Sequence, residues 1–225
     1  MILAGEVSVN GRIVRDPGMK VVPERAKITI GEVRAVQAAP RTILLHKPRG
    51  VVTTRSDEKG RPTVYSLLAE LGTHVIPVGR LDLATTGLLI LTNDTQFSAW
   101  ITDPVNQIPR TYLVTVRGEV TAEVAAVLRA GLCDKGEILK PNALVVRKSS
   151  RRESHLTIEL LEGKNREIRR LLLAAGHEVT QLKRISFGGL ELGALAVGLW
   201  REIGVAELKV AFPGAPLRSG KKSVV

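Results

Sequence analysis

The alternation of apolar and polar positions near the start of the chain predicts a small β unit. Asn10-Gly11 between two short apolar segments is typical of a type I′ hairpin turn, because both central residues of that turn need positive φ. Four short strands are too few to bury a core alone. The pattern predicts strands at Val7–Val9, around Ile13, at Lys20–Val22 and at Lys27–Ile30, followed by a linker at 31–41.

The rest of the chain has longer apolar segments that predict a larger domain. Val64, Leu67, Leu68 and Leu71 fall at i, i+3, i+4 and i+7, which predicts a helix with Thr63 at its start and Gly72 at its end. We expect further helices after Thr121 and from Arg166 to Ala175, the latter with Asn165 as N-cap. Strands are expected at Ile43–His46, Val51–Thr54, Val75–Val78, Leu88–Leu91, Tyr112–Val116, His155–Leu160 and Ala206–Val210.

These strands follow one another in runs rather than in strict β-α-β alternation. The order favours an α+β fold with a mixed, largely antiparallel central sheet and flanking helices over a doubly wound fold. We therefore divide the chain into 1–37, which holds the small β unit and a linker, 38–212, which holds the main domain, and 213–225. The last segment is rich in Pro, Gly, Ser and basic residues, so we expect a disordered basic tail.

The composition narrows the class of protein. Lys and Arg number 33 against 22 Asp and Glu, a net charge of +11, which points to a polyanionic partner such as RNA or DNA. One cysteine excludes a disulfide framework and a Cys-rich zinc site, and it fits a reducing compartment such as the cytoplasm. No apolar run reaches the ~18 residues of a membrane span, and the start does not resemble a signal peptide.

Several common catalytic motifs are absent from the chain. There is no phosphate-binding G-x-x-x-x-G-K-[ST], no G-x-G-x-x-G, no G-x-S-x-G and no H-E-x-x-H, and the four histidines are scattered. The sequence thus argues against an NTPase, a nicotinamide enzyme, a serine hydrolase and a zinc enzyme. We expect neither a metal nor another cofactor.

Three segments carry candidate chemistry, and in one of them, RTYLVTV, Tyr112 opens a strand and is one of only two tyrosines. In VGRLDLATTGLLILTND, Asp82 lies in a loop between two apolar strands, where a nucleophile or base would be both rigid and accessible. In EGKNREIRRLL, a helical wheel places Arg169 at the margin of the buried stripe and Arg166 and Arg170 nearer the opposite side. A buried guanidinium needs an acidic partner, and Asp82 would serve. The plainer alternatives are a turn aspartate, a solvated basic face and, for Tyr112, a half-buried strand aromatic.

Four segments in this order, HKPRGVVTT, VGRLDLATTGLLILTND, RTYLVTV and EGKNREIRRLLLAAGHEV, resemble the bacterial ribosomal-RNA pseudouridine synthases. The resemblance runs from about Ile43 to Ile203. It implies the catalytic domain of that family and an isomerase that converts a uridine of ribosomal RNA to pseudouridine. The stretch VSVNGRIVRDPGMKV resembles the second half of the small RNA-binding module that precedes this domain in many members, so 1–37 is expected to be a partial module.

The resemblance also implies roles for individual residues. Asp82 matches the catalytic carboxylate, Arg169 the arginine that pairs with it, and Tyr112 the active-site tyrosine. Arg80 matches the arginine that fills the gap left by an extruded base. The expected substrate-binding residues are Arg80, Lys47, Arg49, Lys164, Asn165, Arg166 and Arg170, with no metal site.

We expect a cytoplasmic monomer that acts on ribosomal RNA or a pre-ribosomal particle, with large-subunit RNA preferred. Nucleophilic attack by Asp82 on the sugar and attack on the base both stay open. The alternative function is a non-catalytic ribosomal-RNA-binding or ribosome-assembly protein on the same fold. A DNA-binding regulator finds no helix-turn-helix pattern to support it.

Overall fold

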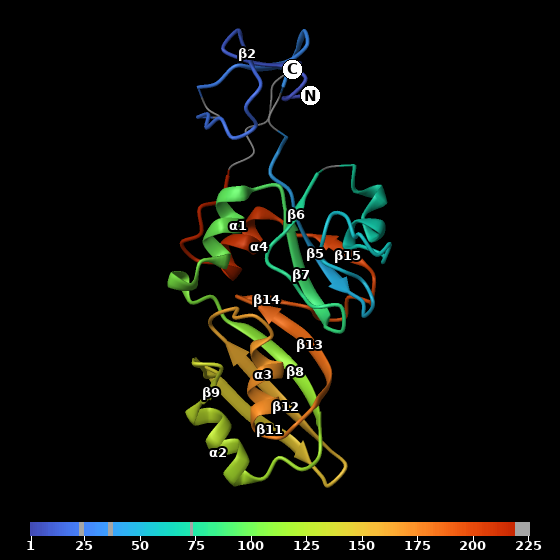
Figure 1. Ribbon diagram of the computed structural model, residues 1–225, viewed down its shortest axis with the longest axis vertical. Helices are drawn as coiled ribbons and strands as arrows, with labels where there is room; N and C mark the ends of the chain where they lie inside the picture. The colour runs from blue at the N-terminus through green and yellow to red at the C-terminus, as the bar shows by residue number, and fades with distance from the viewer. Residues whose placement is uncertain (23–24, 36–37, 73, 219–225) are drawn as a thin grey trace. The chain divides into compact units, whose positions relative to one another are not determined.

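The computed structural model describes residues 1–22, 25–35, 38–72 and 74–218 (Figure 1). The chain divides into two compact units, Met1–Ala39 and Pro40–Val225. In the described part of the chain, no helix is long and apolar enough to span a bilayer.

The smaller unit is an antiparallel sheet in the order β2-β1-β3-β4. Asn10 and Gly11 have φ values of 51° and 80°, and they join Val9 to its partner Arg12, so the predicted type I′ hairpin is confirmed. No described residue of this unit is buried, as expected for so short a piece. The strands are β1 (Val7–Val9), β2 (Arg12–Val14), β3 (Ile28–Ile30) and β4 (Val33–Arg34).

Two details of the smaller unit differ from the sequence-based prediction. Lys20–Val22 forms no strand, and β3 pairs with β1 and β4 instead. β4 itself lies in the stretch that was predicted to be a linker.

The larger unit is built on one mixed sheet. Among the described residues its strands run in the order β11-β12-β8-β13-β7-β5-β15, with β14 beside β13 and β6 beside β7. The pairing of β13 with β7 is parallel and the other pairings are antiparallel. The predicted α+β fold with a largely antiparallel sheet is confirmed.

Five strands of this sheet, β5, β6, β7, β8 and β12, lie close to their predicted positions, whereas β11, β13, β14 and β15 were not predicted. The bounds are β5 (Thr42–Lys47), β6 (Ile76–Pro77), β7 (Thr86–Thr92), β8 (Arg110–Arg117), β11 (Ala143–Ser149), β12 (Glu153–Leu160), β13 (Val179–Phe187), β14 (Leu190–Glu191) and β15 (Trp200–Glu202). A separate two-stranded ribbon is formed by β9 (Leu132–Asp134) and β10 (Glu137–Leu139).

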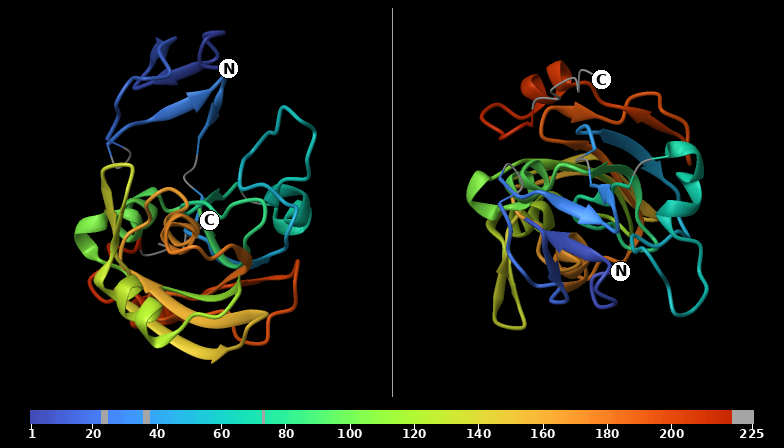
Figure 2. Two further views of the ribbon diagram at one scale, coloured as in Figure 1. Left: turned by 60° about the horizontal axis from the view of Figure 1, so that its bottom comes forward. Right: turned by 90° about the horizontal axis from the view of Figure 1, so that it is seen from above.

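Helices cover both faces of the sheet. α1 (Thr95–Thr102) and α4 (Val205–Ala211) contribute to one apolar core, and α2 (Ala122–Ala130) and α3 (Glu167–Ala174) contribute to the other. Figure 2 (left) shows α3 nearly end-on against the strands. Neighbouring residues of β7, such as Leu89 and Ile90, belong to different cores. This double burial explains why the strand is a continuous apolar run rather than an alternating one.

The helix predicted over 64–71 is replaced by two short 3₁₀ turns, η1 (Val64–Leu67) and η2 (Ala69–Leu71). Thr63 makes no capping hydrogen bond with its side chain, and Leu68 between the turns departs from helical geometry with φ −118° and ψ 16°. The apolar spacing is still used, because the side chains of Val64, Leu68 and Leu71 are buried. The left-handed Gly72 ends the second turn, as expected.

Two predicted strands are wrong. The segment 206–210 belongs to helix α4, in which Leu208 and Ala211 are buried while Val210 is exposed. Alternation of apolar and polar residues over the five residues AELKV is too short a pattern to distinguish a strand from a helix. Val51–Thr54 forms only one bridge, from Val52 to Thr63, instead of a strand.

Part of the segment predicted to be a tail belongs to the larger unit. Ala215 and Leu217 pack against the core that contains α1 and α4. The backbone N–H of Arg218 donates to the Asp94 carboxylate at 3.0 Å, the same side chain that caps α1. The remaining residues of the predicted tail, 219–225, lie outside the described residues.

Candidate active site

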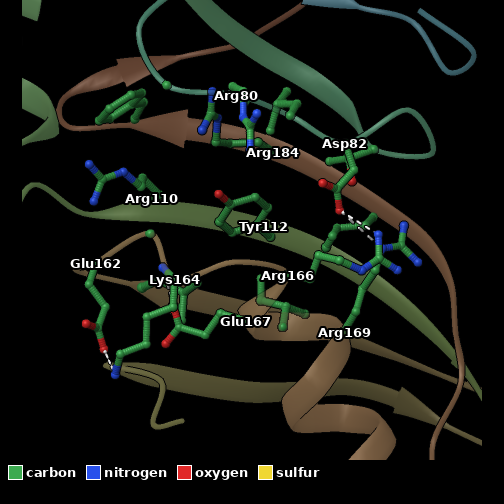
Figure 3. A pocket seen from close by; sticks show the side chains of 18 of the residues that line it. Arg80, Asp82, Arg110, Tyr112, Glu162, Lys164, Arg166, Glu167, Arg169 and Arg184 are labelled. Atoms are coloured by element: carbon green, nitrogen blue, oxygen red, sulfur yellow. Dashed lines mark hydrogen bonds and ion pairs between the residues drawn. The ribbon is translucent and has the colours of Figure 1, made fainter. Parts of the chain in front are cut away.

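A cleft of about 380 Å³ lies in the larger unit, within the range of roughly 300–1,000 Å³ that is usual for small-molecule sites (Figure 3). Its walls come from the loop between β6 and β7, from strands β8 and β13, and from the start of α3. Six of the ten predicted site residues line it: Arg80, Asp82, Tyr112, Lys164, Arg166 and Arg169. Their chemical roles stay predictions.

Asp82 lies in the β6–β7 loop with its carboxylate between two guanidinium groups. Arg166 Nη1 donates to Asp82 Oδ2 at 3.1 Å, and Arg169 Nε lies 4.0 Å from the same oxygen. The expected pairing with Arg169 is thus present but is the looser of the two contacts. The Asp82 side chain keeps 38% of its surface exposed, so it stays accessible from the cleft.

The helical wheel placed Arg166 inside the predicted helix, nearer the side opposite the buried stripe, and this placement is wrong. Arg166 is not part of α3: it precedes Glu167 in the left-handed conformation, with φ 49° and ψ 32°. This backbone turn directs its side chain to the cleft, and it also makes Arg166, rather than Asn165, the N-cap position. No side-chain capping bond replaces the expected one.

Arg169 connects three elements around Asp82. Its Nη1 donates to Val179 O at 3.1 Å in β13, and its Nη2 approaches Ala84 O at 3.5 Å in the β6–β7 loop. Burial, followed by repulsion from Arg166, lowers the pKa of Arg169, while Asp82 raises it and the exposed Arg49 lowers it further. Arg49 does not line the cleft, but its positive charge repels that of Arg169.

Lys47 was predicted to bind substrate, and the structure contradicts this. Its side chain is fully buried, and Nζ donates to three backbone carbonyls: Pro48 O at 3.0 Å, Asp82 O at 3.1 Å and Thr85 O at 2.9 Å. Burial lowers the pKa of Lys47 to about 8, and attraction to Asp82 partly opposes this. Lys47 therefore holds the loop that carries Asp82 instead of facing RNA.

Three more predicted substrate-binding residues differ in their accessibility. Arg170 is held between Asp134 at 2.5 Å and Glu137 at 2.6 Å, both on the β9–β10 ribbon, and lies outside the cleft lining. The exposed Asn165 also lies outside the lining. Lys164 lines the cleft, but its Nζ is bound to Glu162 at 2.6 Å and to Ile138 O at 2.9 Å. The acidic partners of Arg170 come from a segment far away in the sequence, which a helical wheel cannot show.

Tyr112 is both a core residue and a cleft residue. Tyr112 lines the cleft from β8 with 9% of its surface exposed, and it belongs to the core that contains α2 and α3. In Figure 3 its ring lies between Asp82 on one side and Arg110 on the other.

Sequence reasoning missed three buried charged residues that line the cleft: Arg110, Glu167 and Arg184. Arg184 follows Leu182 at the inward-facing positions of β13, and Glu167 lies one turn before Leu171 on the buried side of α3. A charge at an apolar periodic position was the signal that could have identified them. In the described part of the chain, no three His, Cys, Asp or Glu side chains converge as a metal site would require.

Glu167 is the buried acid of the site. Burial, followed by repulsion from Glu162, raises its pKa to about 7 from 4.5. The native protein therefore binds more protons than the unfolded chain between these values, so its stability falls as pH rises from 4.5 to 7. We predict that the unfolding free energy of Glu167→Gln, relative to that of the unmodified protein, increases over this range. The increase is expected to be about 3 kcal/mol between pH 4.5 and pH 8.

Urea unfolding of both proteins at pH 4.5 and at pH 8 measures this difference. Gln is nearly isosteric, and its carbonyl oxygen can still accept the Lys164 N–H that Glu167 accepts at 3.3 Å. The exposed Glu70→Gln controls for the change in net charge. A difference in unfolding free energy that is the same at both pH values would contradict the assignment.

Comparisons with known proteins identify the family of this chain. Residues 41–174 match the family model described as RNA pseudouridylate synthase. The chain is 37% identical to an RNA pseudouridine synthase of Aquifex aeolicus (strain VF5), covering 97% of this chain and 88% of that protein. It is 34% identical to ribosomal large subunit pseudouridine synthase B of Bacillus subtilis (strain 168), covering 93% and 86%, and 35% identical to ribosomal small subunit pseudouridine synthase A of Escherichia coli (strain K12), covering 92% and 89%.

A solved structure supports the same grouping. The crystal structure of a pseudouridylate synthase superposes with a TM-score of 0.71 at 29% identity, covering 92% of this chain and 89% of that one. The family match spans the loop of Asp82, strand β8 with Tyr112, and helix α3 with Arg169. The chain belongs to the RNA pseudouridine synthases, a family of isomerases.

Proposed function

We propose that this protein isomerises a specific uridine of ribosomal RNA to pseudouridine, with Asp82 as the nucleophile. The observation that carries the proposal is the position of the Asp82 carboxylate, 3.1 Å from Arg166 and 4.0 Å from Arg169, at one end of a cleft lined by Tyr112. Large-subunit RNA is the first substrate to test. Relatives named for the large subunit and for the small subunit match at similar identity, so the choice of subunit is the finer part of the proposal.

The reaction needs no external reagent. The C1′–N1 glycosidic bond breaks, the C1′–C5 bond forms, C5 loses its proton and N1 gains one, so substrate and product are isomers. The Asp82 carboxylate adds to the nucleotide, either at the sugar or at the base, and leaves again. Arg166 and Arg169 hold this carboxylate in place for the attack.

A cleft of this kind cannot act on a base that is stacked in RNA. The target uridine therefore rotates out of its stack, at a cost of a few kcal/mol that is smaller in a loop than in a duplex. Arg80 is exposed at the edge of the cleft, where it can occupy the space that the base leaves. The net charge of +11 supports binding to the phosphates around it.

The proposed setting is a cytoplasmic monomer that acts on ribosomal RNA or a pre-ribosomal particle. The second candidate, a non-catalytic RNA-binding or assembly protein, would keep the fold without needing the carboxylate. The presence of Asp82, Tyr112 and Arg169 around one cleft favours the enzyme.

Two measurements test the function. Purified protein incubated with ribosomal RNA is expected to convert one uridine, or a few, to pseudouridine, and the site is found by mapping. Ribosomal RNA from cells with and without the gene is expected to differ at the same position. Identical maps together with no conversion in vitro would leave only the non-catalytic role, whereas a changed site in small-subunit RNA would correct only the subunit.

A further inference from the structure

The charged groups of the cleft have a definite order. Figure 3 shows Asp82 beside Arg166 and Arg169 on one side of the Tyr112 ring, Arg110 on the other side, and Arg80 and Arg184 above the ring. Under the proposed function, Asp82 must reach C1′ or C6 of the uridine. With the base above Tyr112, the opposite edge of the pyrimidine ring, which carries N3 and O4, points away from Asp82, and Arg184, which is paired with Tyr112 across β8 and β13, lies beside this position.

Arg184 lacks a hydrogen-bond acceptor for part of its guanidinium. The side chain is 3% exposed, its Nε donates to Leu88 O at 2.7 Å, and the group lies 5.0 Å from the centre of the Phe187 ring. Its Nη2 is buried and has no partner among the described residues. No carboxylate of the described chain lies within 4 Å of this guanidinium.

Arg110 is the instructive comparison, because it is buried beside the same ring but is well satisfied. Its guanidinium lies 4.7 Å from the centre of Phe187. Nη1 donates to Ile108 O and to Leu161 O, both at 3.0 Å, and Nη2 donates to Ile101 O at 3.1 Å. Of these two buried arginines, Arg184 is therefore the one with a donor left for a ligand.

We propose that Arg184 Nη2 donates a hydrogen bond to O4 of the target uracil and thereby selects uridine over cytidine. An arginine offers only donors, and cytosine carries an amino group at C4 where uracil carries an oxygen. Cytosine would place a donor against a donor and leave the buried Nη2 unpaired. Sites built around such a bond reject analogues that lack the partner strongly.

The contact requires a small movement. Arg184 lines the cleft, but Nη2 itself has almost no accessible surface while the cleft is empty. Rotation about the last side-chain bonds, with the Nε bond to Leu88 O kept as a pivot, would bring Nη2 to the base. An unpaired buried donor costs about 1–3 kcal/mol, so the bond to O4 would relieve a cost that the empty protein carries.

The test compares two RNAs that differ only at the target nucleotide, placed in an unpaired loop so that base pairing is not altered. One contains uridine and the other contains the 2-pyrimidinone ribonucleoside, which lacks O4 and also the N3 proton, so only the part of the difference in Kd that depends on Arg184 is assigned to O4. The Kd of each is measured in an Asp82→Asn background, which is expected to block turnover. With Arg184 present, loss of O4 is expected to weaken binding about 10- to 100-fold, the effect of one hydrogen bond to a charged group.

In Arg184→Met, the two RNAs are expected to bind within about threefold of each other. The matched control is Arg110→Met, which removes a buried guanidinium from the same ring and is expected to lower stability but keep the 10- to 100-fold ratio. If Arg184→Met does not fold, Arg184→Lys is used, and it is expected to shrink the ratio. A ratio that is unchanged in the Arg184 variant, or already near one with Arg184 present, overturns the inference.

This inference rests on the proposed function, yet the two can fail separately. Unmodified protein that forms pseudouridine while the Kd ratio is independent of Arg184 refutes only the role of Arg184. Protein that keeps the ratio but forms no pseudouridine refutes only the catalytic proposal.

Discussion

Replacing Asp82 by Asn is expected to lower pseudouridine formation by at least about 1,000-fold, the scale on which enzymes lose activity when a nucleophile is removed. Asn has nearly the same shape as Asp but carries no charge, so it cannot attack the nucleotide. The change also breaks the ion pairs with Arg166 at 3.1 Å and with Arg169 at 4.0 Å. The affinity for RNA is expected to change little, because phosphate contacts supply most of it.

Single-turnover conversion of ribosomal RNA and filter binding measure the two effects separately. Asp57→Asn is the matched control, because Asp57 also pairs with an arginine, Arg61, at 2.6 Å but lies outside the cleft lining. It should leave turnover within about twofold of the unmodified protein. Asp82→Ala serves as a second variant, and near-normal turnover in either Asp82 variant would exclude the nucleophile assignment.

The parts of the fold that sequence could predict are those in which local and tertiary requirements agree. Asn10-Gly11 forms the hairpin turn that its dipeptide favours. The long apolar run of β7 and the alternation of β12 both matched the burial that the sheet imposes. Asp82 could be suggested as the partner of Arg169 from the buried margin of the predicted helix, but Tyr112 could be added to the same site only through the family resemblance.

The errors in the predicted site come from backbone conformations and tertiary contacts that the sequence pattern does not show. Arg166 faces Asp82 because one left-handed residue precedes α3, and a helical wheel assumes that this residue is helical. Arg170 is neutralised by Asp134 and Glu137, whose ribbon pairs with α3 only in the folded chain. The buried cleft residue Arg184 lies on β13, a strand that the sequence analysis did not predict. For Arg166 and Arg170, a charge was assigned to solvent or RNA before its protein partners were known.

Lys47 gives the other large expected effect, because it holds the loop that carries Asp82 from within the core. Lys47→Met removes the ammonium group that binds the carbonyls of Pro48, Asp82 and Thr85, and leaves them buried without this donor. The loop that carries Asp82 is then free to shift. Since a displacement of about 1 Å can cost about 100-fold in rate, kcat is expected to fall by about 100-fold with little change in KM.

The pH dependence of stability distinguishes this role from simple loss of packing. The pKa of Lys47 is about 8 in the native protein and 10.5 in the reference state, so the unfolded chain binds more protons between these values. Lys47 therefore contributes stability that increases as pH rises from 8 to 10.5, by about 3 kcal/mol in total. This rise is expected to be absent from Lys47→Met.

Urea unfolding from pH 7 to pH 10.5 measures the difference in unfolding free energy between the unmodified protein and Lys47→Met. The difference should be flat up to about pH 8 and then grow in favour of the unmodified protein. Lys209→Met, which changes an exposed lysine of α4, controls for net charge. A difference that stays flat to pH 10.5 would contradict the lowered pKa of Lys47. An unchanged kcat with a raised KM would mean that Lys47 acts on RNA, as first predicted, and not on the loop of Asp82.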